Sequence, residues 1–159
     1  GSMRYTLAHK GVKHVSKNVF DLIESEKKLG LDNERIFLDY KNKVDKIKKN
    51  LIDLLIRLKN DGKKVVGYGA TSKSTTVTNY FGISNQLVSC IYDNTPIKQN
   101  KFSPGVHIPI LSYDEFQKSD PDYVLLFAWN HAAEIMKKEK EYMAKDKHWI
   151  TYIPEVKIN

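Results

Sequence analysis

Residues 63–73 read Lys-Lys-Val-Val-Gly-Tyr-Gly-Ala-Thr-Ser-Lys, which indicates a short apolar strand, a glycine turn and the beginning of a helix. Gly67 and Gly69 allow backbone angles that other residues resist, and they let a ligand approach the main chain closely. The free N–H groups at the start of a helix favour an anion. Because Lys73 adds a positive charge in the first helical turn, the stretch predicts a cradle for a phosphate or a nucleotide.

This cradle departs from both common nucleotide-binding fingerprints. A dinucleotide-binding turn needs a third glycine, and an acidic residue at the end of the next strand. Asp93 fits the acidic position, but Ala70-Thr71-Ser72 does not supply the third glycine. The Gly-Lys-Ser or Gly-Lys-Thr ending of a P-loop is also absent. These residues therefore support two interpretations about equally, a tight turn that binds no ligand and an NAD-binding site.

Downstream of this stretch, strand-like apolar runs alternate with helical segments. Strands are expected at 64–68, 87–92, 108–111, 123–128 and 149–153, and helices at 72–80, 113–118 and 131–145. This alternation predicts an α/β, Rossmann-like fold with a mostly parallel sheet and helices on both of its faces. Ligands in such sheets bind beyond the carboxyl ends of the strands.

The first 62 residues predict an extension of this fold. Residues 4–9 read as a short edge strand, and Ser16 is a plausible N-cap for a helix that stops at Gly30. A second helix begins near Asn33 and carries one continuous apolar stripe until residues 60–62. We expect residues 1–62 to pack on a Rossmann-like domain of residues 63–159, as one structural domain. A coiled-coil role for the long helix is the alternative.

Composition narrows the possible partners. The 159 residues are 41% hydrophobic, which is enough for one domain with a core. No apolar run has the length of a membrane-spanning helix, and the N-terminus lacks a signal-peptide core, so no membrane partner is expected. The net charge is +7, but acidic residues interrupt the lysines, so no nucleic-acid partner is expected. The single cysteine, Cys90, excludes an internal disulfide, reads as a buried structural thiol and suits a cytoplasmic protein.

Candidate site residues gather at the predicted strand ends, on one rim of the sheet. The first strand and its turn offer Gly67, Gly69, Ser72 and Lys73, the end of the second strand offers Asp93 and Asn94, and the end of the fourth offers Asn130 and His131. His131 offers an acid or base, although a capping or surface role is the stronger alternative. The long loop around residues 98–109 adds Lys98, Lys101 and His107, which would meet a phosphate; the alternative is a solvated loop with a packed His107.

Several short motifs agree in order and spacing with one known family. These are Gly67-Tyr68-Gly69-Ala70 with Lys73, Asn79-Tyr80-x-Gly82-Ile83, Tyr92-Asp93-Asn94-x-Pro96-x-Lys98-Gln99, Pro104-Gly105-x-His107-Ile108-Pro109, Pro121-Asp122-Tyr123, and Trp129-Asn130 with Glu134-Ile135. On these residues the chain resembles the C-terminal domain of sugar C-methyltransferases, which act on nucleotide-linked deoxy-ketosugars. The helix ending in Glu26-Lys27-Lys28-Leu29-Gly30-Leu31 also resembles the family, and residues 1–4 resemble the segment that closes the preceding methyltransferase domain.

The resemblance implies that different domains of the protein bind different ligands. Family members carry a zinc-binding domain and an S-adenosylmethionine-binding methyltransferase domain before this one. We expect neither cofactor in this chain, no catalytic residue here, and little activity from the chain alone. The resemblance further implies that a nucleotide-diphosphate sugar lies between the methyltransferase domain of the same protein and this domain.

The leading hypothesis is therefore a nucleotide-sugar-binding module of a C-methyltransferase. In it Gly67, Gly69 and Ser72 present donors to phosphate, Lys73 and Lys98 neutralise charge, Asp93, Asn94 and Asn130 bond sugar or ribose hydroxyls, and His107 lines the pocket. One alternative is a structural or dimerisation module with a vestigial cradle, which docks through its long helix. A stand-alone NAD-type oxidoreductase is the other alternative.

Overall fold

The computed structural model describes residues 3–143 and 147–159. It divides into two units, the chain up to Lys43 and Val44–Asn159, and each is described by itself. In the first unit α1 spans Lys17–Lys28, and α2, Glu34–Asn60, begins there and ends in the second unit. In the described part of the chain, no helix combines the length and apolarity that crossing a membrane requires.

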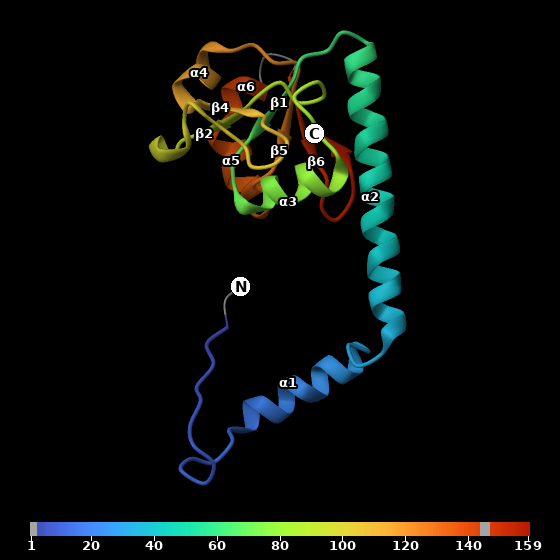
Figure 1. Ribbon diagram of the computed structural model, residues 1–159, viewed down its shortest axis with the longest axis vertical. Coiled ribbons are helices and arrows are strands. Elements are labelled where there is room, and N and C mark those ends of the chain that lie inside the picture. The colour runs from blue at the N-terminus through green and yellow to red at the C-terminus, as the bar shows by residue number, and fades with distance from the viewer. Residues whose placement is uncertain (1–2, 144–146) are drawn as a thin grey trace. The chain divides into compact units, whose positions relative to one another are not determined.

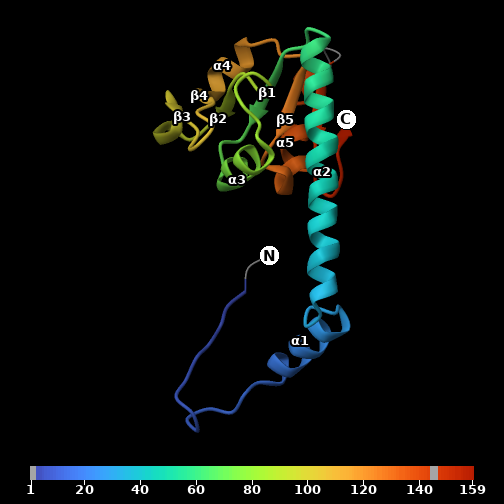
Figure 2. The same ribbon diagram turned by 45° about the vertical axis from the view of Figure 1, so that its right-hand side comes forward.

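The second unit is built on a seven-stranded sheet, as far as the described residues show (Figure 1). Its strands are β1 (Val65–Tyr68), β2 (Ile91–Asp93), β3 (Lys101–Phe102), β4 (Pro109–Ser112), β5 (Tyr123–Leu126), β6 (His148–Thr151) and β7 (Lys157–Ile158). Their order is β3-β4-β2-β1-β5-β6-β7, and Figure 2 shows β3 to β5 following one another across the sheet. The central strands are parallel, and β3 and β7 pair antiparallel at the edges. The predicted α/β fold with a mostly parallel sheet is confirmed.

Helices cover both faces of this sheet, because alternate residues of each central strand point to opposite sides. On one face, Val65 and Leu125 belong to a core that includes Leu51 and Leu55 of α2 and Phe81 of α3 (Ser72–Phe81). On the other face, the core contains Val66, Val124, Trp149 and Phe116 of α4 (Tyr113–Lys118). Side chains of α5 (Ala132–Lys138) and α6 (Lys140–Met143) pack against this second core.

The helix expected at 131–145 is interrupted in the structure. A 3-10 turn, η2 (Trp129–His131), leads into α5, and a break at Glu139 separates α5 from α6. The break coincides with a buried carboxylate: Glu139 accepts hydrogen bonds from the hydroxyls of Tyr68 (2.9 Å) and Tyr113 (3.1 Å). Residues 144 and 145 of the expected helix lie outside the described residues.

The structure differs from the sequence-based expectation in several strands and in the burial of α2. Residues 4–9 are not a strand in the structure. The strand expected at 87–92 begins only at Ile91, because the N–H groups of Leu87 and Val88 donate to the carbonyl of Ser84 in a turn. The edge strands β3 and β7 were not expected, and each has only two residues. The apolar stripe of α2 is buried only in its later part, while Phe37 and Tyr40 are exposed.

Gly67 is required by the packing of the sheet. A Cβ atom at this position would lie 2.7 Å from the ring of Phe127 and 3.0 Å from the side chain of Ile91. We therefore predict that Gly67→Ala lowers the free energy of unfolding by about 1–3 kcal/mol, measured by urea denaturation, because a packed core resists an added methyl group. Gly67→Ala combined with Phe127→Leu should recover part of the loss. A Gly67→Ala variant as stable as the parent would contradict this account.

Cys90 is buried in the second core, and burial raises the pKa of its thiol. Only the thiolate reacts readily, so a raised pKa and a buried sulfur both slow the reaction. We predict that a thiol reagent at pH 8 labels the native chain at least tenfold more slowly than the chain in urea. Labelling at the same rate in both conditions would show that the thiol is accessible.

Candidate functional site

A pocket lies where β1 turns into α3, at the carboxyl ends of the parallel strands. Its volume is about 280 Å³. The lining residues come from the turn and first residues of α3, from the segment between β2 and β4 that includes β3, and from β4 itself. They are Ala70, Thr71, Ser72, Ser74, Thr75, Ile97, Lys98, Lys101, Phe102, Ser103, Pro104 and Ile110. The position agrees with the rule that ligands of α/β sheets bind beyond the strand ends.

The start of α3 offers backbone donors to this pocket. Thr71 is the N-cap, and its hydroxyl accepts a hydrogen bond from the N–H of Ser74 (3.2 Å). The N–H groups of Ser72 and Lys73 find no acceptor among the described residues. They are two of the orphan donors at the positive end of the helix dipole, and this end of α3 therefore favours an anion.

Gly67 and Gly69 have a different role from these donors. Their N–H groups donate to the carbonyls of Cys90 and Tyr92, both at 2.8 Å, and so bond β1 and its turn to neighbouring β2. Gly69 has a φ of 90°, which only glycine adopts at little cost. The two glycines thus shape the turn through packing and backbone angle.

Asp93 connects the ends of the two central strands. Its buried carboxylate accepts hydrogen bonds from the N–H of Ala70 (2.7 Å) and from the N–H of Thr95 (2.8 Å). The ammonium of Lys98 lies 3.4 Å from the same carboxylate. Asp93 therefore fixes the position of the turn before α3 relative to the segment with Thr95 and Lys98 that forms one wall of the pocket.

Lysines make the pocket a site for a negatively charged group. Lys98 is half-exposed and reaches Asp93, while Lys101 on β3 is exposed at the rim. Beside them lie the apolar side chains of Ile97 and Phe102, which are 74% and 62% exposed. The loop thus presents cations next to a water-exposed apolar surface.

The loop is attached to α3 through Asn79. The side-chain amide of Asn79 donates to the carbonyl of Pro104 (2.9 Å) and to that of Thr75 (2.8 Å). A Cβ atom at Gly105 would overlap the amide of Asn79, and Gly105 has a φ of 82°. The separate motifs that contain Asn79 and Pro104-Gly105 therefore form one contact.

The structure brings together only part of the predicted site. Ser72 and Lys98 line the pocket, whereas Lys73, Asn94, His107 and Asn130 are not among its lining residues. Asn94, His107 and Asn130 are exposed, and His107 has a φ of 52°. The sequence predicted no role for Ile97, Phe102 or Thr75. Two apolar residues in a lysine-rich loop were the available signal.

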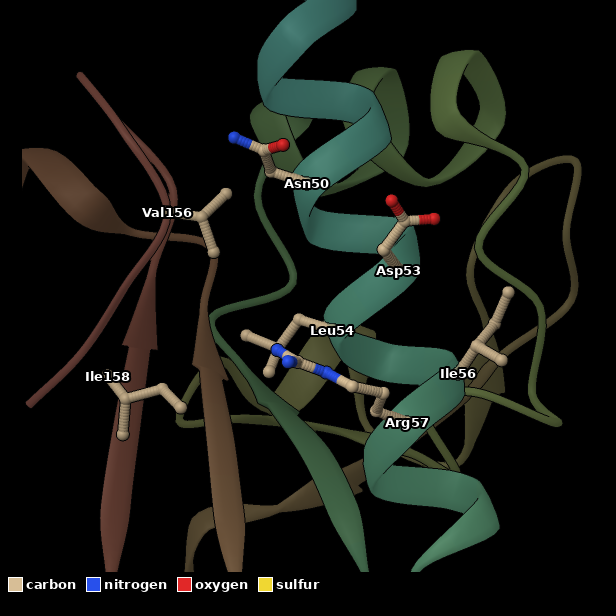
Figure 3. A pocket seen from close by; sticks show the side chains of 7 residues that line it. All are labelled: Asn50, Asp53, Leu54, Ile56, Arg57, Val156 and Ile158. Carbon is tan, nitrogen blue, oxygen red and sulfur yellow. The ribbon is translucent and has the colours of Figure 1, made fainter.

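A larger groove of about 680 Å³ lies elsewhere, between α2 and the edge strand β7 (Figure 3). Its lining residues are Asn50, Asp53, Leu54, Ile56, Arg57, Val156 and Ile158. It does not lie at the carboxyl ends of the parallel strands, and it contains one side chain of each charge. Its chemistry therefore points less clearly to a ligand than that of the smaller pocket.

The fold and pocket define a Rossmann-like α/β domain with a cationic site at its strand ends. The sequence profile described as "C-methyltransferase C-terminal domain" matches residues 1–154. C-methyltransferase NovU from Streptomyces niveus is 33% identical over 140 residues, which are 88% of this chain and 33% of that protein. This chain belongs to the C-methyltransferase C-terminal domain family, as its motifs suggested, and it spans about a third of the length of this curated relative.

The resemblance implies two cofactors for other domains, zinc and S-adenosylmethionine. Zinc sites use clustered Cys, His or acidic side chains, and the described residues contain no group of three or more that would hold a metal ion. S-adenosylmethionine carries a positive sulfonium, whereas the pocket at the start of α3 presents lysines and helix N–H groups. The pocket is suited to an anion instead.

We predict that Asp93→Asn destabilises the domain by about 1–3 kcal/mol, because an amide presents one acceptor oxygen where the carboxylate presents two to buried N–H groups. The measurement is thermal or urea unfolding followed by circular dichroism. Asn94→Ala, at the exposed neighbouring position, is the matched control and should be nearly neutral. Equal stability of Asp93→Asn and the parent would remove the structural role of this carboxylate.

Proposed function

We propose that this chain is the nucleotide-sugar-binding module of an S-adenosylmethionine-dependent sugar C-methyltransferase of deoxysugar biosynthesis. The observation that carries the proposal is the pocket at the start of α3, with orphan N–H groups at Ser72 and Lys73 and with Lys98 and Lys101 on its wall. Family membership supports the transferase class. The single buried thiol of Cys90 supports a cytoplasmic location, where thiols stay reduced.

The diphosphate is the part of a nucleotide-sugar that this pocket suits best. Phosphate oxygens accept hydrogen bonds from helix N–H groups and charge-assisted bonds from lysine. The hydroxyls of Ser72 and Thr75 add donors within the same lining. Asn94, Asn130 and Asp93 remain candidates for sugar or ribose hydroxyls, and His107 for the outer rim.

The pocket suits one part of the ligand. Its volume of about 280 Å³ lies at the lower end of the roughly 300–1,000 Å³ of sites that enclose a drug-sized molecule, and a nucleotide-sugar is a large ligand. The remaining wall would come from the methyltransferase domain of the same protein. That domain would hold S-adenosylmethionine, the source of the methyl group, and would supply the base that removes the proton next to the keto group of the sugar. This chain would hold and orient the sugar through its diphosphate.

A structural or interaction module is the second candidate, and one observation favours it. Within the unit up to Lys43, none of the described residues 3–43 is buried by the others, although many are apolar. A docking role does not exclude ligand binding. The NAD-type oxidoreductase has less support, because the third glycine of the fingerprint is absent.

Titration calorimetry with a panel of nucleotide-diphosphate sugars tests the proposal. We expect binding to the folded chain, and we expect Lys98→Ala and Lys101→Ala each to weaken it about tenfold or more, because each removes a charge-assisted contact with phosphate. Lys73→Ala tests the remaining cation of the first helical turn. Lys118→Ala, at the exposed end of α4, is the matched control and should bind as the parent does.

Lys98 also contacts Asp93, so its variant is judged only after a melting curve shows a folded chain. Lys101 has no such buried partner in the described residues, and its variant separates ligand binding from stability. A folded chain that binds no member of the panel contradicts the proposal. Binding that is weakened by none of the variants Lys73→Ala, Lys98→Ala and Lys101→Ala contradicts it as well.

A further inference from the structure

The contact between Asn79 and the turn at Pro104 lies at the border of the pocket at the start of α3. The side-chain nitrogen Nδ2 of Asn79 donates to the carbonyl of Thr75 (2.8 Å) and to that of Pro104 (2.9 Å). Thr75 lines the pocket from the helix, and Pro104 lines it from residues 94–108, the lysine loop. Asn79 is not itself a lining residue, so it contacts both walls of the pocket from outside.

Asp93 joins the same two walls at another point. Its carboxylate oxygen Oδ2 accepts the N–H of Ala70 (2.7 Å) and lies 3.4 Å from the ammonium of Lys98. Ala70 lines the pocket before the helix, and Lys98 lines it from the lysine loop. The two walls are therefore connected at the strand ends by Asp93 and further along α3 by Asn79.

Helical spacing places Asn79 where it can make this contact. Thr71, Thr75 and Asn79 follow one another at intervals of four residues, so they share one face of α3. The first two line the pocket, and the third bonds the lysine loop. An amide nitrogen carries two hydrogens, so Asn79 bonds the carbonyl of its own helix and still has a donor for the loop.

The bond from Asn79 is the one hydrogen bond between the lysine loop and α3 in the part of the chain that the structure describes. The other hydrogen bonds of the loop hold the loop itself or join it to strands. The N–H of Asn100 donates to the carbonyl of Ile110, and Ser103 and Ile108 bond each other. Without the amide of Asn79 the loop would therefore stay folded, but its position relative to α3 would be less fixed.

Gly105 leaves free the space that the amide of Asn79 occupies. A Cβ atom at Gly105 would overlap this amide, and the φ of Gly105 is 82°. Glycine meets both demands, because it has no side chain and adopts positive φ at little cost. The bond between Asn79 and Pro104 thus requires the absence of a side chain at the next residue of the loop.

We propose that Asn79 is a positioning residue, which holds the lysine loop at the distance from α3 at which both walls bind one phosphate-containing ligand. The donors for such a ligand come from separate elements, since the N–H groups of Ser72 and Lys73 belong to α3 and the ammonium groups of Lys98 and Lys101 to the loop. A loop that is already in place costs less to order on binding, so the bond raises the affinity of the pocket.

This inference rests on the proposed function, because it takes the pocket as the site of a phosphate-containing ligand. It adds the residue that sets the distance between the two groups of donors. Asn79 itself does not contact the ligand, and its effect on affinity is exerted through the loop.

Titration calorimetry with two probes, pyrophosphate and the panel of nucleotide-diphosphate sugars, tests the role of Asn79. Asn79→Ala should weaken binding about fivefold or more, because the ligand must then order the loop. Alanine favours helix, so this variant should melt close to the parent. Asn79→Asp keeps the size but has no donor for the two carbonyls, and it should bind at least as weakly.

Hydrogen exchange measures the loop without any ligand. In Asn79→Ala the amides of residues 103–107 should exchange at least threefold faster than in the parent, because the loop is less fixed. The amides of β1 and β5 in the centre of the sheet should exchange as in the parent.

Tyr80→Phe is the matched control. Tyr80 follows Asn79 on α3, and its hydroxyl donates to Asp45 of α2 (3.2 Å), not to the loop. The control should bind both probes as the parent does. Gly105→Ala should weaken binding in the parent but much less in the Asn79→Ala variant, where its Cβ meets no amide.

The role of Asn79 is contradicted if both of its variants bind as the parent does, if Tyr80→Phe weakens binding equally, or if exchange in residues 103–107 is unchanged. If the parent binds only one of the two probes, that probe decides. Binding of pyrophosphate alone contradicts the proposed function and still decides the role of Asn79. Nucleotide-sugar binding that no Asn79 variant weakens keeps the proposed function and removes this inference, and a parent that binds neither probe removes both.

Discussion

The buried carboxylate of Asp93 is the interaction on which the candidate site depends. It accepts the N–H of Ala70 at the end of the glycine turn and the N–H of Thr95 after β2, and it lies beside the ammonium of Lys98. These contacts join two neighbouring strands at their carboxyl ends and set the direction in which α3 begins. The orphan N–H groups of α3 and the cation on the opposite wall are therefore arranged before any ligand arrives. Such prior arrangement reduces the cost of ordering a site on binding.

The central part of the fold was predictable because its signals are local. The strand, turn and helix of residues 64–81 follow from apolar runs and glycine, and the structure places them within a residue or two of the expectation. The helix at Tyr113–Lys118 begins at a capping box of Ser112 and Glu115, which is also a local signal. Features that depend on distant contacts were not predictable. The break at Glu139 coincides with hydrogen bonds from two tyrosine hydroxyls of other elements, and the edge strands β3 and β7 are too short to show a period.

The difference between local signals and contacts of distant residues also explains which parts of the candidate site were predictable. The sequence indicated that Ser72 and Lys98 would approach each other, because strand ends and a following loop share one rim of a parallel sheet. It did not indicate that Phe102 would pair in an edge strand and reach the same pocket. Nor did it show that the N–H groups of Gly67 and Gly69 would bond to the carbonyls at β2. The sequence of a glycine turn is the same whether its N–H groups face a ligand or a neighbouring strand.

The packing of Gly67 against Phe127 has a consequence for how such motifs are recognised across genomes. Because an aromatic ring occupies the space of the absent side chain, selection for a stable sheet is sufficient to keep glycine at this position. A related domain that had lost its ligand would still display the Gly-Tyr-Gly pattern. The glycines therefore record the ancestry of the sheet. Lys98 also pairs with the buried carboxylate of Asp93, whereas exposed Lys101 is free to change once no anion is bound. A survey of relatives should use the position of Lys101, and not the glycines, to separate ligand-binding members from vestigial ones.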